Sequence, residues 1–188
     1  QISYNLRSNT YPCNTTMIDM NIQNQMYDFS ADNYLNYSSQ GFPALDYMFY
    51  GLDSDTTNIV NIYDTDNLFL EYSKALIDEL VINTQSVLDY WNNEKSSFVN
   101  SNGNTATSSL NMLANDFIYY YEKGFRANKI GIPAGVYSSS SSLPQNVEGY
   151  YSQYFSRKLA LHALESTRKF FTGESFSTSQ TGSSLVSY

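Results

Sequence analysis

The densest apolar run in the N-terminal third of the chain reads Gln40-Gly41-Phe42-Pro43-Ala44-Leu45-Asp46-Tyr47-Met48-Phe49-Tyr50-Gly51. A single carboxylate, Asp46, lies inside it. A proline in the first turn of a helix costs no hydrogen bond, because the first N–H groups have no intrahelical partner. We therefore predict a short helix that opens at 42–44, carries Asp46 near its first turn, and stops at Gly51 with positive φ.

Three longer segments on the C-terminal side repeat apolar residues at helical spacing, and a shorter one precedes the run. The shorter helix is predicted at 16–25, and the long ones at 66–91, 108–128 and 146–171. Small polar residues separate the long segments, as they do in loops, and no stretch alternates as a strand does. The sequence therefore predicts an all-α fold, an antiparallel helical bundle.

Polar residues predict the structure of two further segments. Aspartates at 53, 55, 64 and 66 predict an acidic, solvated loop over 53–67, because the glycine and the final glutamate of a calcium-binding loop are missing. Near the C-terminal end, Gly182-Ser183-Ser184 resembles the cap of a fourth long helix.

Composition excludes several classes of function. The 188 residues have a formal net charge of -8, and such a surface repels a phosphate backbone, so no nucleic-acid partner is expected. The chain has one cysteine and one histidine, which are too few for most metal clusters, and we expect no metal and no cofactor. No window approaches the roughly 20 apolar residues of a membrane span.

Three charged side chains stand out as more than surface residues. Asp46 lies in an apolar run, where burial requires a partner. Arg126 and Lys129 lie where the second long helix meets the segment Gly131-Ile132-Pro133-Ala134-Gly135. An ion pair from Asp46 to Arg126 or Lys129 would join these two segments. It would either fix a loop or line a ligand-binding cleft.

The segment 41–51 resembles the signature of the imelysin family, in which Gly-x-His-x-x-Glu precedes an apolar run and a glycine. Gly41 matches the motif glycine, Asp46 falls at the glutamate, and Pro43 falls at the histidine. The segments 14–19, 129–135 and 144–152 resemble further parts of the family. Together these segments are spread over most of the chain.

This resemblance implies a helical fold of two related bundles. Because members are longer than this chain, it also implies that 1–188 is one imelysin-like helical domain, a fragment that lacks helices at both ends. It implies an exported bacterial envelope protein, in the periplasm or at the outer-membrane surface, often a lipoprotein with a lipid anchor outside this chain. Members are described as insulin-cleaving peptidases, and relatives are tied to iron uptake or to polysaccharide binding.

The departure at Pro43 changes the expected function. Proline has no side-chain donor, acceptor or metal-binding lone pair, so the motif histidine is lost outright. We therefore expect no catalytic residue and no metal, and a non-catalytic site for a glycan, a peptide or an iron-related compound. Its predicted residues are Gly41, Pro43, Asp46, Arg126 and Lys129. The alternatives are a metallopeptidase of the family and a structural helical module of an envelope complex.

Overall fold

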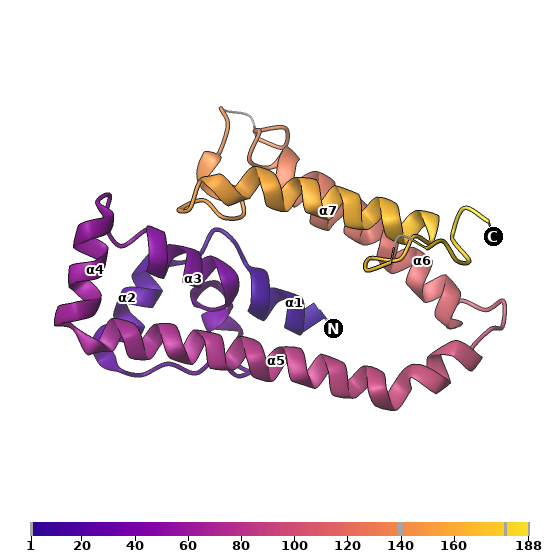
Figure 1. The fold of residues 1–188 in the computed structure, drawn as a ribbon, viewed down its shortest axis with the longest axis horizontal. Helices are drawn as coiled ribbons and strands as arrows, with labels where there is room; N and C mark the ends of the chain where they lie inside the picture. The colour runs from indigo at the N-terminus through magenta and orange to yellow at the C-terminus, as the bar shows by residue number, and fades with distance from the viewer. Residues whose placement is uncertain (1, 139–140, 179, 188) are drawn as a thin grey trace. The chain divides into compact units, whose positions relative to one another are not determined.

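Helices make up the regular structure of this chain in a computed structural model that describes residues 2–138, 141–178 and 180–187. These residues form seven α-helices (Figure 1), and the only β-type pairing among them is an isolated bridge between Glu174 and Thr181. The predicted all-α fold class is confirmed. No helix in the described ranges is both long and apolar enough to cross a membrane.

The chain divides into two units, and each is described by itself. Unit 1 comprises residues 1–92 and 148–154, and unit 2 comprises 93–147 and 155–188. The prediction of a single domain over 1–188 stays a prediction.

Unit 1 contains the predicted motif helix and four other α-helices. The elements are α1 (Ile2–Asn9), α2 (Thr15–Asn24), the 3₁₀ helix η1 (Tyr34–Ser39), α3 (Gly41–Tyr50), α4 (Thr56–Thr65) and the long α5 (Asn67–Asn100) as far as Asn92. Within this unit, α1, α2 and α3 lie along the N-terminal half of α5 (Figure 1). The helix predicted at 16–25 is confirmed as α2, which Asn14 caps by accepting a hydrogen bond from the Met17 amide.

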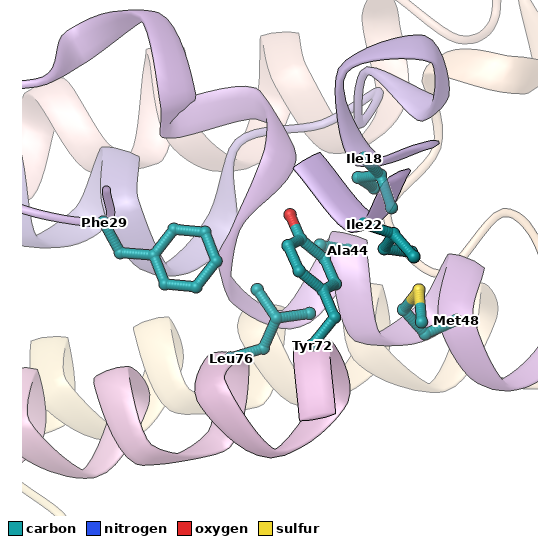
Figure 2. Packing of buried hydrophobic residues seen from close by; sticks show 7 residues of the cluster. All are labelled: Ile18, Ile22, Phe29, Ala44, Met48, Tyr72 and Leu76. Atoms are coloured by element: carbon teal, nitrogen blue, oxygen red, sulfur yellow. The ribbon is translucent and has the colours of Figure 1, made fainter. Parts of the chain in front are cut away.

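The core of unit 1 lies where α2, α3 and α5 meet. Tyr72 and Leu76 rise from α5 between Phe29 on one side and the side chains of α2 and α3 on the other (Figure 2). The buried cluster consists of Ile18, Ile22, Phe29, Ala44, Met48, Tyr72 and Leu76. Removing these side chains from water is the main favourable contribution to the stability of the unit.

Polar contacts fix the elements around this core. The buried Tyr72 hydroxyl donates to the Ser39 carbonyl oxygen at 2.7 Å, which ties η1 to α5. The Tyr63 hydroxyl of α4 donates to the Met48 carbonyl oxygen of α3 at 3.1 Å. Arg7 of α1 forms an ion pair with Glu79 of α5. The motif helix α3 itself contacts α1, α2, η1 and α4, so neighbouring elements hold it in place.

Unit 2 is built from two helices that lie side by side (Figure 1). Its elements are the end of α5 (93–100), α6 (Ser109–Tyr119), which continues directly into the π-helix η2 (Tyr120–Gly131), the 3₁₀ helix η3 (Pro144–Asn146) and α7 (Tyr154–Thr172), whose first residue belongs to unit 1. Phe117 of α6 stacks on Phe170 and Phe171 of α7, with ring centroids 5.4 and 5.8 Å apart. The predicted helix over 108–128 is thus present, with its second half wound as a π-helix.

Several predicted boundaries are wrong. The acidic segment 53–67 is mostly helical, because Asp55 caps α4 by accepting a hydrogen bond from the Thr57 amide. The helix predicted at 146–171 begins only at Tyr154, since Gly149 and Gln153 have positive φ. Residues 182–184 begin no helix within the described range 180–187.

Candidate functional site

The motif glycine Gly41 is the first residue of α3 and is required by its backbone. Its φ is +76°, a conformation that L side chains rarely adopt. A Cβ at this position would also lie about 2.3 Å from the carbonyl oxygen of Ser8. Gly41 therefore lets the C-terminal end of α1 pack directly against the start of α3.

The motif acid Asp46 holds a distant segment of the chain. Its Oδ2 accepts a hydrogen bond from the Tyr151 amide at 2.8 Å, and its Oδ1 accepts one from the Ser152 amide at 3.0 Å. The receiving segment turns at Gly149, where φ is +69°, and the Ser152 hydroxyl donates to the Gly149 carbonyl oxygen at 3.2 Å. Because both carboxylate oxygens bind consecutive amides, Asp46 fixes the conformation of this turn.

The second glycine of the motif, Gly51, allows the Tyr151 ring of the 149–152 segment to pack closely against α3. A Cβ on Gly51 would lie 2.4 Å from Cδ1 of Tyr151 and 2.6 Å from Cδ2 of Tyr47. The Tyr47 and Tyr151 rings pack with centroids 5.1 Å apart. Gly51 has φ of −115°, so the predicted positive φ is wrong, and the absence of a side chain serves packing instead.

Cys13 lies beside this tyrosine pair. Burial is the main reason that the pKa of its thiol rises to about 11, and the hydrogen bond with Tyr151 opposes the shift. Burial likewise raises the pKa of Tyr47 to about 12, helped by the nearby Asp19 carboxylate, and raises the pKa of Tyr151. These three groups are therefore neutral at physiological pH, and the thiol is a poor nucleophile there.

The donor set around the motif does not fit a metal ion. Pro43 is buried in the first turn of α3 and offers no ligand atom. Each Asp46 oxygen already accepts a backbone hydrogen bond. In the described part of the chain, no group of three or more His, Cys, Asp or Glu side chains is placed to hold a metal ion.

The two predicted basic site residues lie on η2 in unit 2. Nε of the exposed Arg126 donates to Oε2 of Glu122, one turn earlier, at 2.7 Å, and this bond is the main reason that its pKa is raised. Lys129 is half-buried in the last turn of η2. Asp46 thus accepts hydrogen bonds from two backbone amides of its own unit, and Arg126 donates to a glutamate of its own helix. The ion pair from Asp46 to Arg126 or Lys129 stays a prediction.

A groove lies between α3 and α5. Its volume is about 380 Å³, and its walls are mostly apolar. The apolar lining consists of Phe42 and Leu45 from α3 and of Ile77, Leu80, Val81 and Leu88 from α5. Phe42 is 61% exposed and Val81 is 62% exposed, so the groove presents hydrophobic side chains at the surface. The sequence did not predict this groove, although Phe42 belongs to the motif itself.

The chain was compared with models of known protein families. The family model described as Imelysin (Peptidase_M75) matches residues 2–188. The chain belongs to the imelysin family. The searches of curated proteins and of solved structures found no match.

Within this imelysin-family chain, Gly41, Asp46 and Gly51 of the motif each have a structural role. Gly41 admits α1, Asp46 binds the turn at 149–152, and Gly51 admits the Tyr151 ring. Sequence reasoning identified the three motif residues but missed Tyr151 and Ser152. The only signal for these two was the Gly149-Tyr150-Tyr151-Ser152 segment, which we assigned to a helix.

Proposed function

We propose that this chain is a non-catalytic, ligand-binding member of the imelysin family. The observation that carries the proposal is the use of Asp46, whose two carboxylate oxygens accept the Tyr151 and Ser152 amides. A carboxylate in this role is a structural element, and Pro43 supplies no second ligand or base beside it. The residues of the motif therefore build a scaffold and perform no hydrolysis.

Binding is supported by the surface next to the motif. The groove between α3 and α5 is open and apolar, and ligand sites are commonly concave and mostly apolar. The ligand classes that follow from the family resemblance are a glycan, a peptide or an iron-related compound. Exposed Tyr50, Tyr120 and Tyr121 offer further aromatic surface, each within its own unit.

The proposed location is the bacterial envelope, in the periplasm or at the outer-membrane surface. Support comes from membership in the imelysin family, which the sequence resemblance ties to exported proteins. Fractionation of cells that express the complete native protein tests this location. Recovery in the cytosolic fraction would contradict it.

A cleavage assay tests the absence of catalysis. Purified chain is incubated with a defined peptide mixture, with and without added Zn²⁺ or Fe²⁺, and the products are followed by mass spectrometry. We expect intact peptides under all conditions. Metal-dependent cleavage that disappears in Asp46→Ala would establish the metallopeptidase alternative instead.

A ligand screen separates binding from a purely structural role. Thermal-shift measurements with glycans, peptides and ferric chelates are expected to show a concentration-dependent increase in Tm for one class, because a ligand that binds only the folded chain stabilises it. No shift with any class, in a folded sample, would favour the structural module.

A further inference from the structure

We propose that the groove between α3 and α5 binds an amphipathic helix of a partner protein whose polar face is rich in lysine and arginine. The inference deepens the proposed function, since it rests on a chain that binds peptides without cutting them. It assigns the site to the α3–α5 surface of unit 1 and the ligand class to cationic helical segments.

The shape of the groove fits one face of a helix. Its lining on α5 extends from Ile77 to Leu88, with Val81 one turn after Ile77. At about 1.5 Å per residue this is roughly 16 Å, the length of about three helical turns. A helix laid into such a groove anchors through apolar residues at i, i+3 or i+4 and i+7. Phe42 and Leu45 of α3 form the opposite wall.

The chemistry of the lining favours a peptide over a sugar. Among the residues that the structure describes, the polar lining of the groove consists of Thr84 and Gln85. The Gln85 side-chain nitrogen already donates to Oδ1 of Asp89 at 2.7 Å. A glycan would bring many hydroxyl groups to walls with few polar partners, and each unpaired group costs free energy. Apolar side chains of a helix gain from the same walls.

The negative charge of unit 1 indicates that the polar face of the bound helix is basic. Unit 1 holds 2 Lys or Arg against 13 Asp or Glu residues, a formal charge of −11, whereas unit 2 holds 8 against 5, a formal charge of +3. Exposed Asp78 and Asp89 are sequence neighbours of the lining residues Ile77 and Leu88 on α5. Lys74 is the one basic residue of α5 within unit 1. A basic helix is attracted to this surface. The same face of a second copy is repelled by it.

Two adjacent side chains of α5 provide a matched test. Val81 lines the groove and is 62% exposed, whereas Ile82 lies outside it and is 57% exposed. Both are β-branched and well exposed, so Val81→Asp and Ile82→Asp should both fold. Each adds one negative charge, which strengthens nonspecific attraction to a basic peptide. A loss of affinity in Val81→Asp but not in Ile82→Asp therefore shows that the peptide binds in the groove.

The probe is an 18-residue helical peptide of leucine and lysine, compared with its leucine and glutamate counterpart by calorimetry. We expect the lysine peptide to bind wild type and Ile82→Asp with 1:1 stoichiometry. Its affinity for Val81→Asp should be lower by at least roughly tenfold, because a buried carboxylate opposes apolar contact. The affinity should fall as salt rises, since salt screens exposed charges. The glutamate peptide should not bind.

Each other outcome overturns the inference. Absence of binding, or equal binding by Val81→Asp and Ile82→Asp, removes the groove as the site. A wild-type dimer in light scattering that dissociates in Val81→Asp identifies a second copy as the occupant. Slow thiol labelling of Val81→Cys relative to Ile82→Cys shows that a segment of the same chain covers the groove. Mass spectrometry of the bound peptide tests the proposed function separately, because cleavage would contradict it whether or not the groove is used.

Discussion

The backbone amide of Ser152 donates to Oδ1 of Asp46 at 3.0 Å, across 106 residues of sequence. The preceding amide, that of Tyr151, binds the other oxygen of the same carboxylate. One side chain of α3 thereby brings the segment 148–154 into unit 1. The segment in which we predict a non-catalytic binding site therefore also connects distant parts of the sequence.

Replacing Asp46 should weaken this connection in a measurable way. Asp46→Ala leaves the Tyr151 and Ser152 amides without their acceptor, and we expect the free energy of unfolding to fall by about 1–3 kcal/mol. Chemical denaturation measures the change. Hydrogen exchange should show faster exchange at these two amides, while the amides of α5 near Tyr72 stay protected.

The matched control for this substitution is Asp32→Ala, which removes an exposed carboxylate from the segment between α2 and α3. It should leave the free energy of unfolding within about 0.5 kcal/mol of wild type. Equal exchange at Tyr151 and Ser152 in wild type and Asp46→Ala would contradict the assigned role.

Gly51→Ala should destabilise unit 1 through the Tyr151 ring. The new Cβ would lie 2.4 Å from Cδ1 of Tyr151, so either the ring or the end of α3 must move. We expect a loss of about 1–3 kcal/mol, as for other overpacked sites. Gly103→Ala is the control, because a Cβ there meets nothing within 4 Å. If both variants lose the same stability in denaturation, the packing argument fails.

Alkaline pH should destabilise the folded chain. Burial raises the pKa of the Cys13 thiol from 9.0 to about 11, and raises the pKa of Tyr72 from 10.0 to about 12. The unfolded chain therefore releases these protons first. The stability is fully present below about pH 9 and is lost as the pH rises toward 11 and 12. Denaturation at a series of pH values measures this, and Cys13→Ala should reduce the slope between pH 9 and 11.

The same pKa shift predicts slow chemistry at Cys13. At pH 8 the thiolate fraction should be roughly 100-fold smaller than for a thiol of pKa 9.0, since the two pKa values differ by about two. Alkylation by iodoacetamide should be slower in proportion, and should become fast in denaturant. Rapid alkylation of the folded chain would show that Cys13 is exposed or activated.

The sequence was sufficient for the helices that carry strong periodicity. The apolar stripe of Tyr72 and Leu76 on α5 became the core, as the spacing predicts. The fold class followed from the same spacing, whereas the family followed from the resemblance of residues 41–51 to the imelysin signature. Periodicity succeeds here because a helix packed on one side must repeat its apolar residues about every turn.

The contacts of the motif could not be read in this way. The sequence indicates that a buried Asp46 requires a partner, and the structure supplies the backbone amides of Tyr151 and Ser152. Any residue except proline supplies an amide, so no residue type at 151 and 152 marks this role. Gly149 and Gln153 have positive φ, so the predicted helix begins only at Tyr154, and the periodicity of apolar residues carries no signal for this.

Metal titration of wild type and Asp46→Ala, followed by Tm, tests most directly the claim that Asp46 is structural. We predict that Zn²⁺ and Fe²⁺ leave the Tm of wild type unchanged at stoichiometric concentrations, while Asp46→Ala lowers the Tm by the same amount with or without metal. A metal-dependent increase in the Tm of wild type that is absent in Asp46→Ala would contradict the account, because it would make Asp46 a metal ligand.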